Sequence, residues 1–455
     1  MPAVLAWERR LERWSPPVSW SLVEESLDEA EFLWSWREAA QGAHDETPDG
    51  VEQRIEDRLQ GAIEGLCVPG PSEIDRLLRL LAPALDRGEP AIVAVAAHAL
   101  LAGGTGEGFD CFAGAFWGAS GARLESLRRG LELIPAAAPY LGLIAASRHA
   151  TENARAAFLE ACAFRGLPIE PHVGELVTSS NVELQRAAAG LLRYAPRTVA
   201  DEHLTCAFGC ADPRASEIAV ESGLVLGFPE AWRVGRALAL ADVSGSAALL
   251  PALAMLGTAA DHDSVLRLLG RPLRQPEVIW ALGFGGRRSG ADACVDLLAQ
   301  QRHVGLAAEA FCAITGLDLA GAGLIAARAE EDDDEAPPFE NDDLNAALVP
   351  CAEERLPQPE VSALIRWWNG NRARFDPCVR YLGGQPTSLQ RLAGALAGGP
   401  MRRRAPIAFE LAVRTRGRVQ IQTRAFLAEQ RRRLATFRMT SGGTAGATSG
   451  DPCCS

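Results

Sequence analysis

Apolar residues recur at helical spacing along most of the chain, in short segments that Gly, Pro, Asp or Asn interrupt. Clear examples are SEIDRLLRLLAPAL, AIVAVAAHALLAG, ARLESLRRGLELI and VELQRAAAGLLRYA. Apolar positions three and four residues apart predict helices, and the interrupting residues predict turns between them. Ala and Leu are plentiful whereas Tyr, Thr and Ile are scarce, which favours helices over strands. We therefore expect an all-α protein.

The helical segments repeat at an irregular interval. The small residues that close successive segments lie 32, 30, 26 and 33 positions apart by subtraction, at Ala195, Gly227, Gly257, Gly283 and Gly316. Helical hairpins of roughly 30 to 45 residues are typical of HEAT-like α-solenoids. Within VIWALGFGGRRSGADACVDLL we expect Gly283 to Gly290 to turn the chain between two helices. A phosphate-binding loop would need a preceding strand, and the pattern on both sides is helical.

Composition divides the chain into five parts. Residues 1–70 hold five of the ten tryptophans, which we expect to act as packing anchors of an N-terminal helical cap. Residues 71–328 form the repeat array, and residues 329–360 an acidic loop. Residues 361–438 form an Arg-rich helical region that caps the other end. The small polar residues of 439–455 predict a disordered tail in which Cys453 and Cys454 have no assigned role.

Charge is strongly polarised, although the whole chain carries a net charge of −13. Residues 330–360 contain twelve carboxylates and one arginine, whereas residues 361–438 contain sixteen arginines and three carboxylates. The acidic run is a solvated insert, a contact for a basic partner or a cation site. The arginines are either the polar face of packed helices or a contact for a partner; nucleic acid is disfavoured by the acidic total. The candidate partner-binding residues are Asp332, Asp333, Asp334, Glu335, Arg402, Arg403 and Arg404.

Motifs for catalysis are missing from the sequence. The chain contains no lysine, which removes the Walker-A and Schiff-base lysines, and its seven histidines show no HExxH spacing. No GxSxG elbow occurs. Asp261 and Asp263 stand where a helix should begin, so we interpret them as capping residues. We expect a non-enzymatic protein without metal or cofactor.

The sequence also predicts a cytoplasmic protein that does not insert into membranes. No apolar run reaches about 18 residues. The first residues, MPAVLAWERRLERW, carry charges where a signal peptide would need an apolar core.

Three stretches, LVEESLDEAEFLWSWREAA, LAAEAFCAITGLDL and WWNGNRARFDPCVRYLGG, give the chain a resemblance to a known family. It resembles the HEAT-repeat proteins of undefined activity that are encoded in or beside type VI secretion loci of Gram-negative bacteria. The third stretch carries a compact signature, which we expect to lock a terminal cap onto the last repeat: Trp367, Trp368, Arg372, Phe375, Arg380, Tyr381 and Gly384.

This resemblance implies an accessory of type VI secretion that acts as a scaffold or adaptor through protein-protein contact. It implies no catalytic residue and no cofactor. Two alternatives stay open, which are an immunity protein that neutralises a secreted toxin and a HEAT-like chromophore lyase.

Overall fold

The computed structural model describes residues 18–146, 150–167, 173–241, 249–326, 353 and 355–442, and their regular structure is almost entirely helical. The expected all-α class is therefore confirmed. The chain forms two compact units, which we call unit 1 (Met1–Ala39 with Val51–Arg165) and unit 2 (Ala40–Gly50 with Gly166–Ser455). The predicted 71–328 array is thus shared between the units. Among the described helices, none has the length and apolar content needed to cross a membrane.

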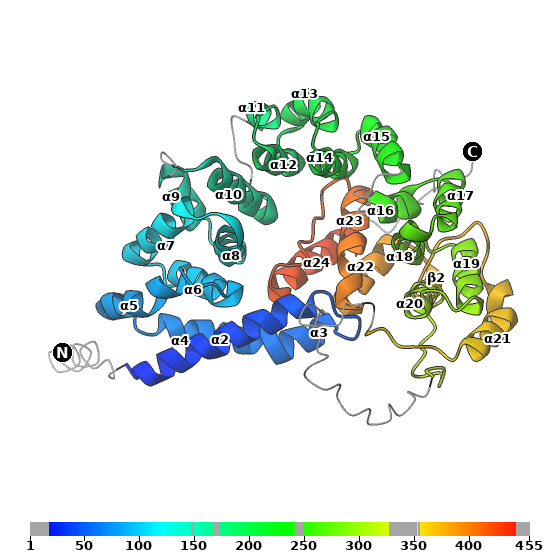
Figure 1. The fold of residues 1–455 in the computed structure, drawn as a ribbon, viewed down its shortest axis with the longest axis horizontal. Coiled ribbons are helices and arrows are strands. Elements are labelled where there is room, and N and C mark those ends of the chain that lie inside the picture. Colours follow the sequence, from blue (N-terminus) through cyan, green and yellow to red (C-terminus); the bar gives the residue numbers. More distant parts are fainter. Residues whose placement is uncertain are drawn as a thin grey trace, which may run out of the picture. The chain divides into compact units, whose positions relative to one another are not determined.

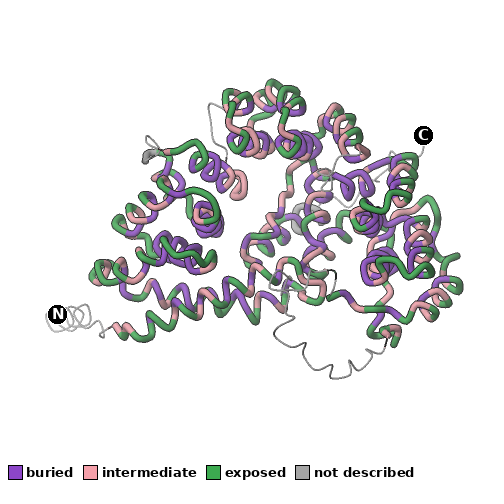
Figure 2. The backbone as a smooth tube through the Cα atoms, viewed as in Figure 1, coloured by how far each residue is buried: buried purple, intermediate pink, exposed green. Residues whose placement is uncertain are grey.

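Unit 1 is built from two alternating rows of helices (Figure 1). The short helix α3 (Pro48–Val51) leads into it through a π-helical turn, η1. Its elements are α2 (Trp20–Ala40), η1 (Glu52–Glu56), α4 (Asp57–Cys67), η2 (Pro71–Glu73), α5 (Ile74–Ala84), α6 (Pro90–Ala102), α7 (Gly106–Gly118), α8 (Gly121–Glu132), α9 (Ala138–Ala146) and α10 (Glu152–Arg165). Helix α6 packs on α4, α5, α7 and α8, so every side chain from Ile92 to Leu101 is buried (Figure 2). This explains why its sequence, AIVAVAAHALLA, has almost no polar face.

Unit 2 continues the alternation with a longer series of helices. In its inner row α12 packs on α14, α16 on α18, and α18 on α20. The series consists of α11 (Val173–Val177), α12 (Val182–Leu191), α13 (Arg197–Phe208), α14 (Pro213–Leu226), α15 (Pro229–Leu240), α16 (Leu249–Leu256), α17 (Ala259–Arg267), α18 (Gln275–Gly285), α19 (Arg288–Ala299) and α20 (Val304–Thr315). Short 3-10 turns join some of them, at η4 (Leu192–Tyr194), η5 (Leu268–Gly270) and η6 (Pro272–Arg274).

The C-terminal region of unit 2 does not simply cap the end of the series. Helix α21 (Val361–Asn371) packs on α19, as a cap would, and η8 (Arg372–Arg374) follows it. A hairpin of β1 (Tyr381–Leu382) and β2 (Gln385–Pro386) then turns the chain back. The remaining elements are α22 (Leu389–Gly398), η9 (Met401–Arg403), α23 (Arg404–Arg414) and α24 (Leu427–Gly442). Helix α23 contacts α14 and α16, so this region lines the inner row of unit 2 (Figure 1).

The glycines that end the helices give a more regular repeat than the sequence predicted. Helix α18 runs through Gly283 and ends at Gly286, whose left-handed φ of 66° is one that glycine adopts readily. Gly227 and Gly316 end α14 and α20 in the same way. With Gly257 after α16, the intervals between helix ends become 30, 29 and 30 residues by subtraction. The turn after α18 is therefore shorter than the expected Gly283 to Gly290.

Two other local expectations change slightly. The N-cap residue of α17 is Thr258, and Asp261 completes a capping box with it. Asp261 therefore takes part in capping, as expected, but as the third residue of the helix. At the other end of the chain, α24 continues to Gly442. The expected disordered tail therefore begins with helical residues, and its remainder, residues 443–455, lies outside the described part.

Candidate functional site

The predicted partner-binding residues do not form one site. Asp332, Asp333, Asp334 and Glu335 lie outside the described residues. The arginine triplet lies at the start of α23 inside unit 2, where the side chain of Arg402 is 8% exposed and Arg403 and Arg404 are 6% and 1% exposed. Arg404 donates hydrogen bonds to the Leu396 carbonyl at 3.0 Å and to Oε1 of Gln430 at 2.6 Å. The triplet packs within its own unit, as the alternative of packed helices has it, and partner binding by these arginines stays a prediction.

The aromatic residues of the signature form a packed cluster. Trp368 of α21 lies between Phe311 of α20 and Phe375, with ring centroids 5.3 Å from each, and Phe375 contacts Tyr381 at 5.0 Å. Trp367 also packs on Phe311, at 5.9 Å. Centroid distances of about 4.5 to 7 Å are favourable for aromatic pairs. The cluster fastens α21 and β1 to α20.

The polar residues of the signature complete this attachment. Arg372 donates from Nε and Nη2 to the two oxygens of Asp292 on α19, and Trp368 donates from Nε1 to the same carboxylate. Arg380 donates to the Gly285 carbonyl and to Glu410, which joins β1 to α18 and α23. At Gly384 an added Cβ would lie 2.4 Å from the Thr315 carbonyl oxygen, so the backbones approach too closely for a side chain.

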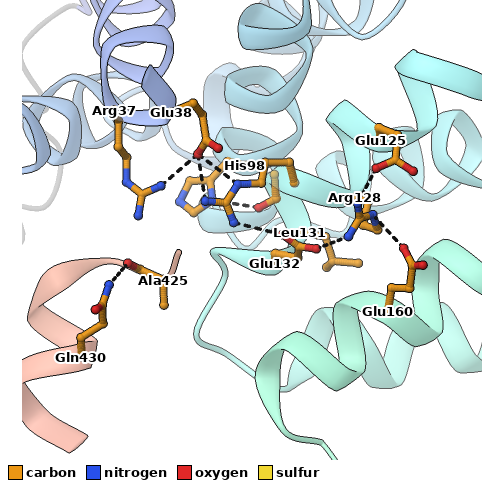
Figure 3. A network of polar contacts seen from close by, with 12 residues as sticks. Arg37, Glu38, His98, Glu125, Arg128, Leu131, Glu132, Glu160, Ala425 and Gln430 are labelled. Carbon is orange, nitrogen blue, oxygen red and sulfur yellow. Dashed lines mark hydrogen bonds and ion pairs between the residues drawn. The ribbon is translucent and has the colours of Figure 1, made fainter. Parts of the chain in front are cut away.

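Unit 1 contains a chain of ion pairs, most of them buried or partly buried, that the sequence did not reveal (Figure 3). Arg37 of α2 donates to Glu56 and Glu38, and Arg129 of α8 donates to Glu38 and Glu132. Arg128 extends the chain from Glu132 to Glu125 and to Glu160 of α10. Charges removed from water need such partners. Because every carboxylate of the network drawn in Figure 3 has an arginine partner, we interpret the network as structural.

His98 lies beside that network, and its role is also structural. Its Nδ1 lies 3.0 Å from the Gly130 carbonyl oxygen, which bridges α6 and α8. Burial lowers the pKa of His98 to about 4, and the nearby charges of Arg37 and Arg129 act in the same direction. The imidazole is therefore neutral at physiological pH.

The strongest candidate for a binding site is a cavity of about 670 Å³ in unit 2, which we call the α20–α22 cavity. Helix α20 supplies Glu309 and Cys312, α22 supplies Gly394 and Gly398, and Arg403 lies at the border of η9 and α23. Its apolar walls come from other parts of the same unit: Leu319, Ile325, Leu356, Pro357, Leu382 and Ile407. A cavity of this size with a few polar groups is typical of small-molecule sites.

The charged groups of the cavity are poorly paired. Nη1 of Arg403 lies 3.6 Å from Oε1 of Glu309, and Nε of Arg402 lies 3.4 Å from the same oxygen. Within the described residues, no hydrogen bond reaches either Nη atom of Arg403 or either oxygen of Glu309, and all four atoms are buried. The Arg403 guanidinium lies over the rings of Phe284 and Trp280, 4.2 and 5.0 Å from their centroids. Burial lowers the pKa of Arg403, partly offset by the charge of Glu309.

The Cys312 thiol in the cavity wall is a poor nucleophile. Burial raises the pKa of the Cys312 thiol to about 12, so the thiolate is scarce at neutral pH. Among the described residues, no cluster of three His, Cys, Asp or Glu side chains could hold a metal ion. The sequence contains one signal for this site that our interpretation passed over, which is the lone carboxylate Glu309 in the apolar segment LAAEAFCAI.

No known protein-family model matches the chain, and no curated protein and no solved structure matches it either.

Proposed function

We propose that this protein is a non-enzymatic scaffold that holds a protein partner. The observation that carries the proposal is the tandem series of helical hairpins in unit 2, with helix ends at intervals of 30, 29 and 30 residues. Each hairpin packs mainly on its neighbours, which makes an extended and preformed face. A preformed face binds a partner with little loss of conformational entropy.

Charged and polar side chains that hold helices together support this proposal. Asp292, Glu410 and Glu56 each accept hydrogen bonds from arginines of other elements, and so they hold helices together. His98 is neutral and bridges two helices. Side chains with these roles favour a rigid body whose task is binding.

The resemblance to HEAT-repeat proteins of type VI secretion loci directs the choice of partner. We propose that the protein is an accessory of that machine and binds one of its components in the cytoplasm. The immunity and lyase alternatives predict different results for the same purified protein, so one experiment separates them.

The test is to tag the full chain in a secretion-active bacterium that encodes it, purify it at low salt and identify the accompanying proteins by mass spectrometry. Recovery of sheath, baseplate or spike proteins supports the scaffold. Recovery of a single toxin supports the immunity protein, and a visible absorbance band of a bound pigment supports the lyase. A strain carrying the tag on an unrelated protein is the control, and a protein that is repeatedly recovered alone contradicts the scaffold.

A further inference from the structure

The first turn of α19, within unit 2, supports an inference that is independent of the scaffold. We propose that this turn binds a phosphate group. The guanidinium of Arg287, the backbone N–H groups of Arg288 and Ser289 and the hydroxyl of Ser289 hold the phosphate oxygens. All of these groups can donate hydrogen bonds, and the guanidinium adds a positive charge.

Arg287 is a buried positive charge without a counter-ion. The residue is only 9% exposed, its Nε is enclosed without a hydrogen-bond partner, and no carboxylate of the described residues forms an ion pair with it. Its two Nη atoms make no hydrogen bond to the described residues either, but they are not enclosed, so a ligand can reach them. Charges that are removed from water are as a rule paired in native proteins, and we therefore expect an anion beside this guanidinium.

The start of α19 offers further donors at the same place. No side chain caps the helix, whose N-cap residue is Arg287, and the N–H groups of Gly290 and Ala291 donate to the Arg287 carbonyl. The N–H groups of Arg288 and Ser289 come before these bonds, so they have no acceptor within the helix. The start of this 12-residue helix is also the positive end of its dipole, which favours an anion.

The buried His262 indicates where the guanidinium of Arg287 lies. Nε2 of His262 is 3.1 Å from Oγ of Ser289, and Ser289 itself is exposed. The pKa of His262 is lowered to about 4, first by burial and second by the positive charge of Arg287, which places that charge near the imidazole. The guanidinium and the hydroxyl therefore lie beside the same imidazole, at the start of α19.

The hydroxyl of Ser289 can donate to a ligand. Nδ1 of His262 is enclosed without a hydrogen-bond partner. A proton on Nε2, donated to Oγ of Ser289, leaves no N–H of the imidazole unpaired, so this tautomer is favoured. The hydroxyl then accepts from His262, and its own hydrogen is available to a phosphate oxygen.

The neighbouring charges favour a phosphate over a neutral ligand. Two carboxylates close by in the sequence, Asp261 and Asp292, already accept hydrogen bonds from other arginines. A third, Asp263, is exposed and forms no ion pair with Arg287. Donors with a positive charge and no competing carboxylate suit the several oxygens of a phosphate. Because α18 and not a strand precedes this turn, it does not begin a nucleotide-binding βαβ unit, and the expected ligand is a single phosphate group.

Titration calorimetry of the full chain at constant ionic strength tests the ligand class. We expect inorganic phosphate to bind at one saturable site, at least tenfold more tightly than acetate, which has one charge and only two oxygens. Phenyl phosphate distinguishes the source of the group, because equal affinity indicates inorganic phosphate and higher affinity indicates a phosphate ester. Equal affinity for phosphate and acetate, or no saturable binding of either phosphate probe, would overturn the proposal, and water would then be the partner of Arg287.

Two substitutions locate the phosphate at the start of α19. Arg287→Met removes the charge and keeps much of the buried side-chain volume, so it should weaken phosphate binding at least tenfold. Ser289→Asp places a carboxylate at the second residue of the helix, where it takes up the same donors and the same charge. It should abolish phosphate binding and raise the melting temperature. Phosphate affinity equal to that of the wild type in either variant would contradict the proposal.

Thr198→Asp in α13 is the matched control. Thr198 is also the exposed second residue of a helix of unit 2 without a side-chain cap, and the neighbouring Arg197 is already paired with Asp201. Its phosphate affinity should equal that of the wild type. Because only the helix dipole acts there, its melting temperature should rise less than that of Ser289→Asp. An equal rise would show that Arg287 does not face the new carboxylate, contrary to the proposal.

Discussion

The guanidinium of Arg37 donates a hydrogen bond of 2.7 Å to the carboxylate of Glu56, and the two side chains are 0% and 5% exposed. Arg37 belongs to α2, whereas Glu56 is the last residue of the π-helical turn η1. The wider turn brings both Ile55 and Glu56 into the interior of unit 1. A π turn thus places one carboxylate where a buried guanidinium needs it.

Removing one partner of this pair should be costly. We expect Glu56→Ala to lower the free energy of unfolding of unit 1 by about 3 to 5 kcal/mol, since it leaves the Arg37 charge without its strongest buried partner. The double variant Arg37→Met with Glu56→Leu should lose far less, because no charge is then left buried. Urea denaturation followed by circular dichroism measures both. Equal losses in the single and double variants would show that packing, and not charge, dominates here.

The buried His98 predicts a loss of stability in mild acid. Its pKa falls from 6.5 to about 4 in the folded chain, so the unfolded chain binds the proton more tightly. The contribution is complete above pH 6.5 and is lost as pH falls toward 4, by up to about 3 kcal/mol. His98→Asn keeps a donor for the Gly130 carbonyl and should remove this part of the pH dependence. Denaturation curves at pH 7.5 and 4.5 give the difference, and an identical pH slope in the variant would contradict the prediction.

Two glycines with the same backbone conformation should respond differently to alanine. Gly316 and Gly227 both have a left-handed φ, of 72° and 76°. An added Cβ at Gly316 would lie 2.5 Å from the Gly383 carbonyl oxygen, whereas at Gly227 the nearest atom is 3.8 Å away. We expect Gly227→Ala to cost about 1 kcal/mol, from backbone strain alone. Gly316→Ala should cost at least twice as much in thermal or urea denaturation, and equal losses would contradict the close approach of β1 and α20.

The carboxylate of Asp292 should contribute to the attachment of α21. Although burial opposes it, hydrogen bonds from Arg372 and Trp368 hold the pKa of Asp292 below its ordinary value. Stability from this group is therefore present above pH 3.8 and is lost as pH falls further. Because Arg372 is 47% exposed, solvent weakens the pair, and we expect Asp292→Asn to cost only about 1 to 2 kcal/mol. Trp368→Phe, which removes one hydrogen bond to Asp292 and keeps most of the ring packing, is the comparison.

The helical class could be predicted from the sequence because it depends on local spacing of apolar residues. The exact helix ends could not be predicted in this way. In the segment GFGG both Gly283 and Gly286 suit a helix end, and the choice of Gly286 reflects the approach of Tyr381 in β1, whose carbonyl oxygen an added Cβ at Gly286 would strike. That contact joins residues 95 positions apart by subtraction, so no local pattern contains it.

The burial of Arg403 in the candidate site could be predicted from the sequence even less well than the helix ends. The sequence predicts that the arginines at 402–404 form a polar helix face, because charged side chains are mostly exposed. Arg403 is buried because it stacks on Trp280 and Phe284, more than 100 positions earlier in the chain. The ion pairs of Arg129 with Glu38 likewise span 91 positions. Such pairings depend on tertiary packing, whereas sequence patterns report only neighbours along the chain.

The return of α23 to α14 and α16 has a consequence for synthesis on the ribosome. Unit 1 draws its described helices from residues 20–40 and 52–165, so it can close early. In unit 2, Met255 of α16 and Phe284 of α18 are buried together with Leu411 and Leu434 of the last helices. These apolar side chains stay uncovered until almost the whole chain has emerged. During synthesis the later unit therefore passes through a stage in which this apolar surface is open to aggregation.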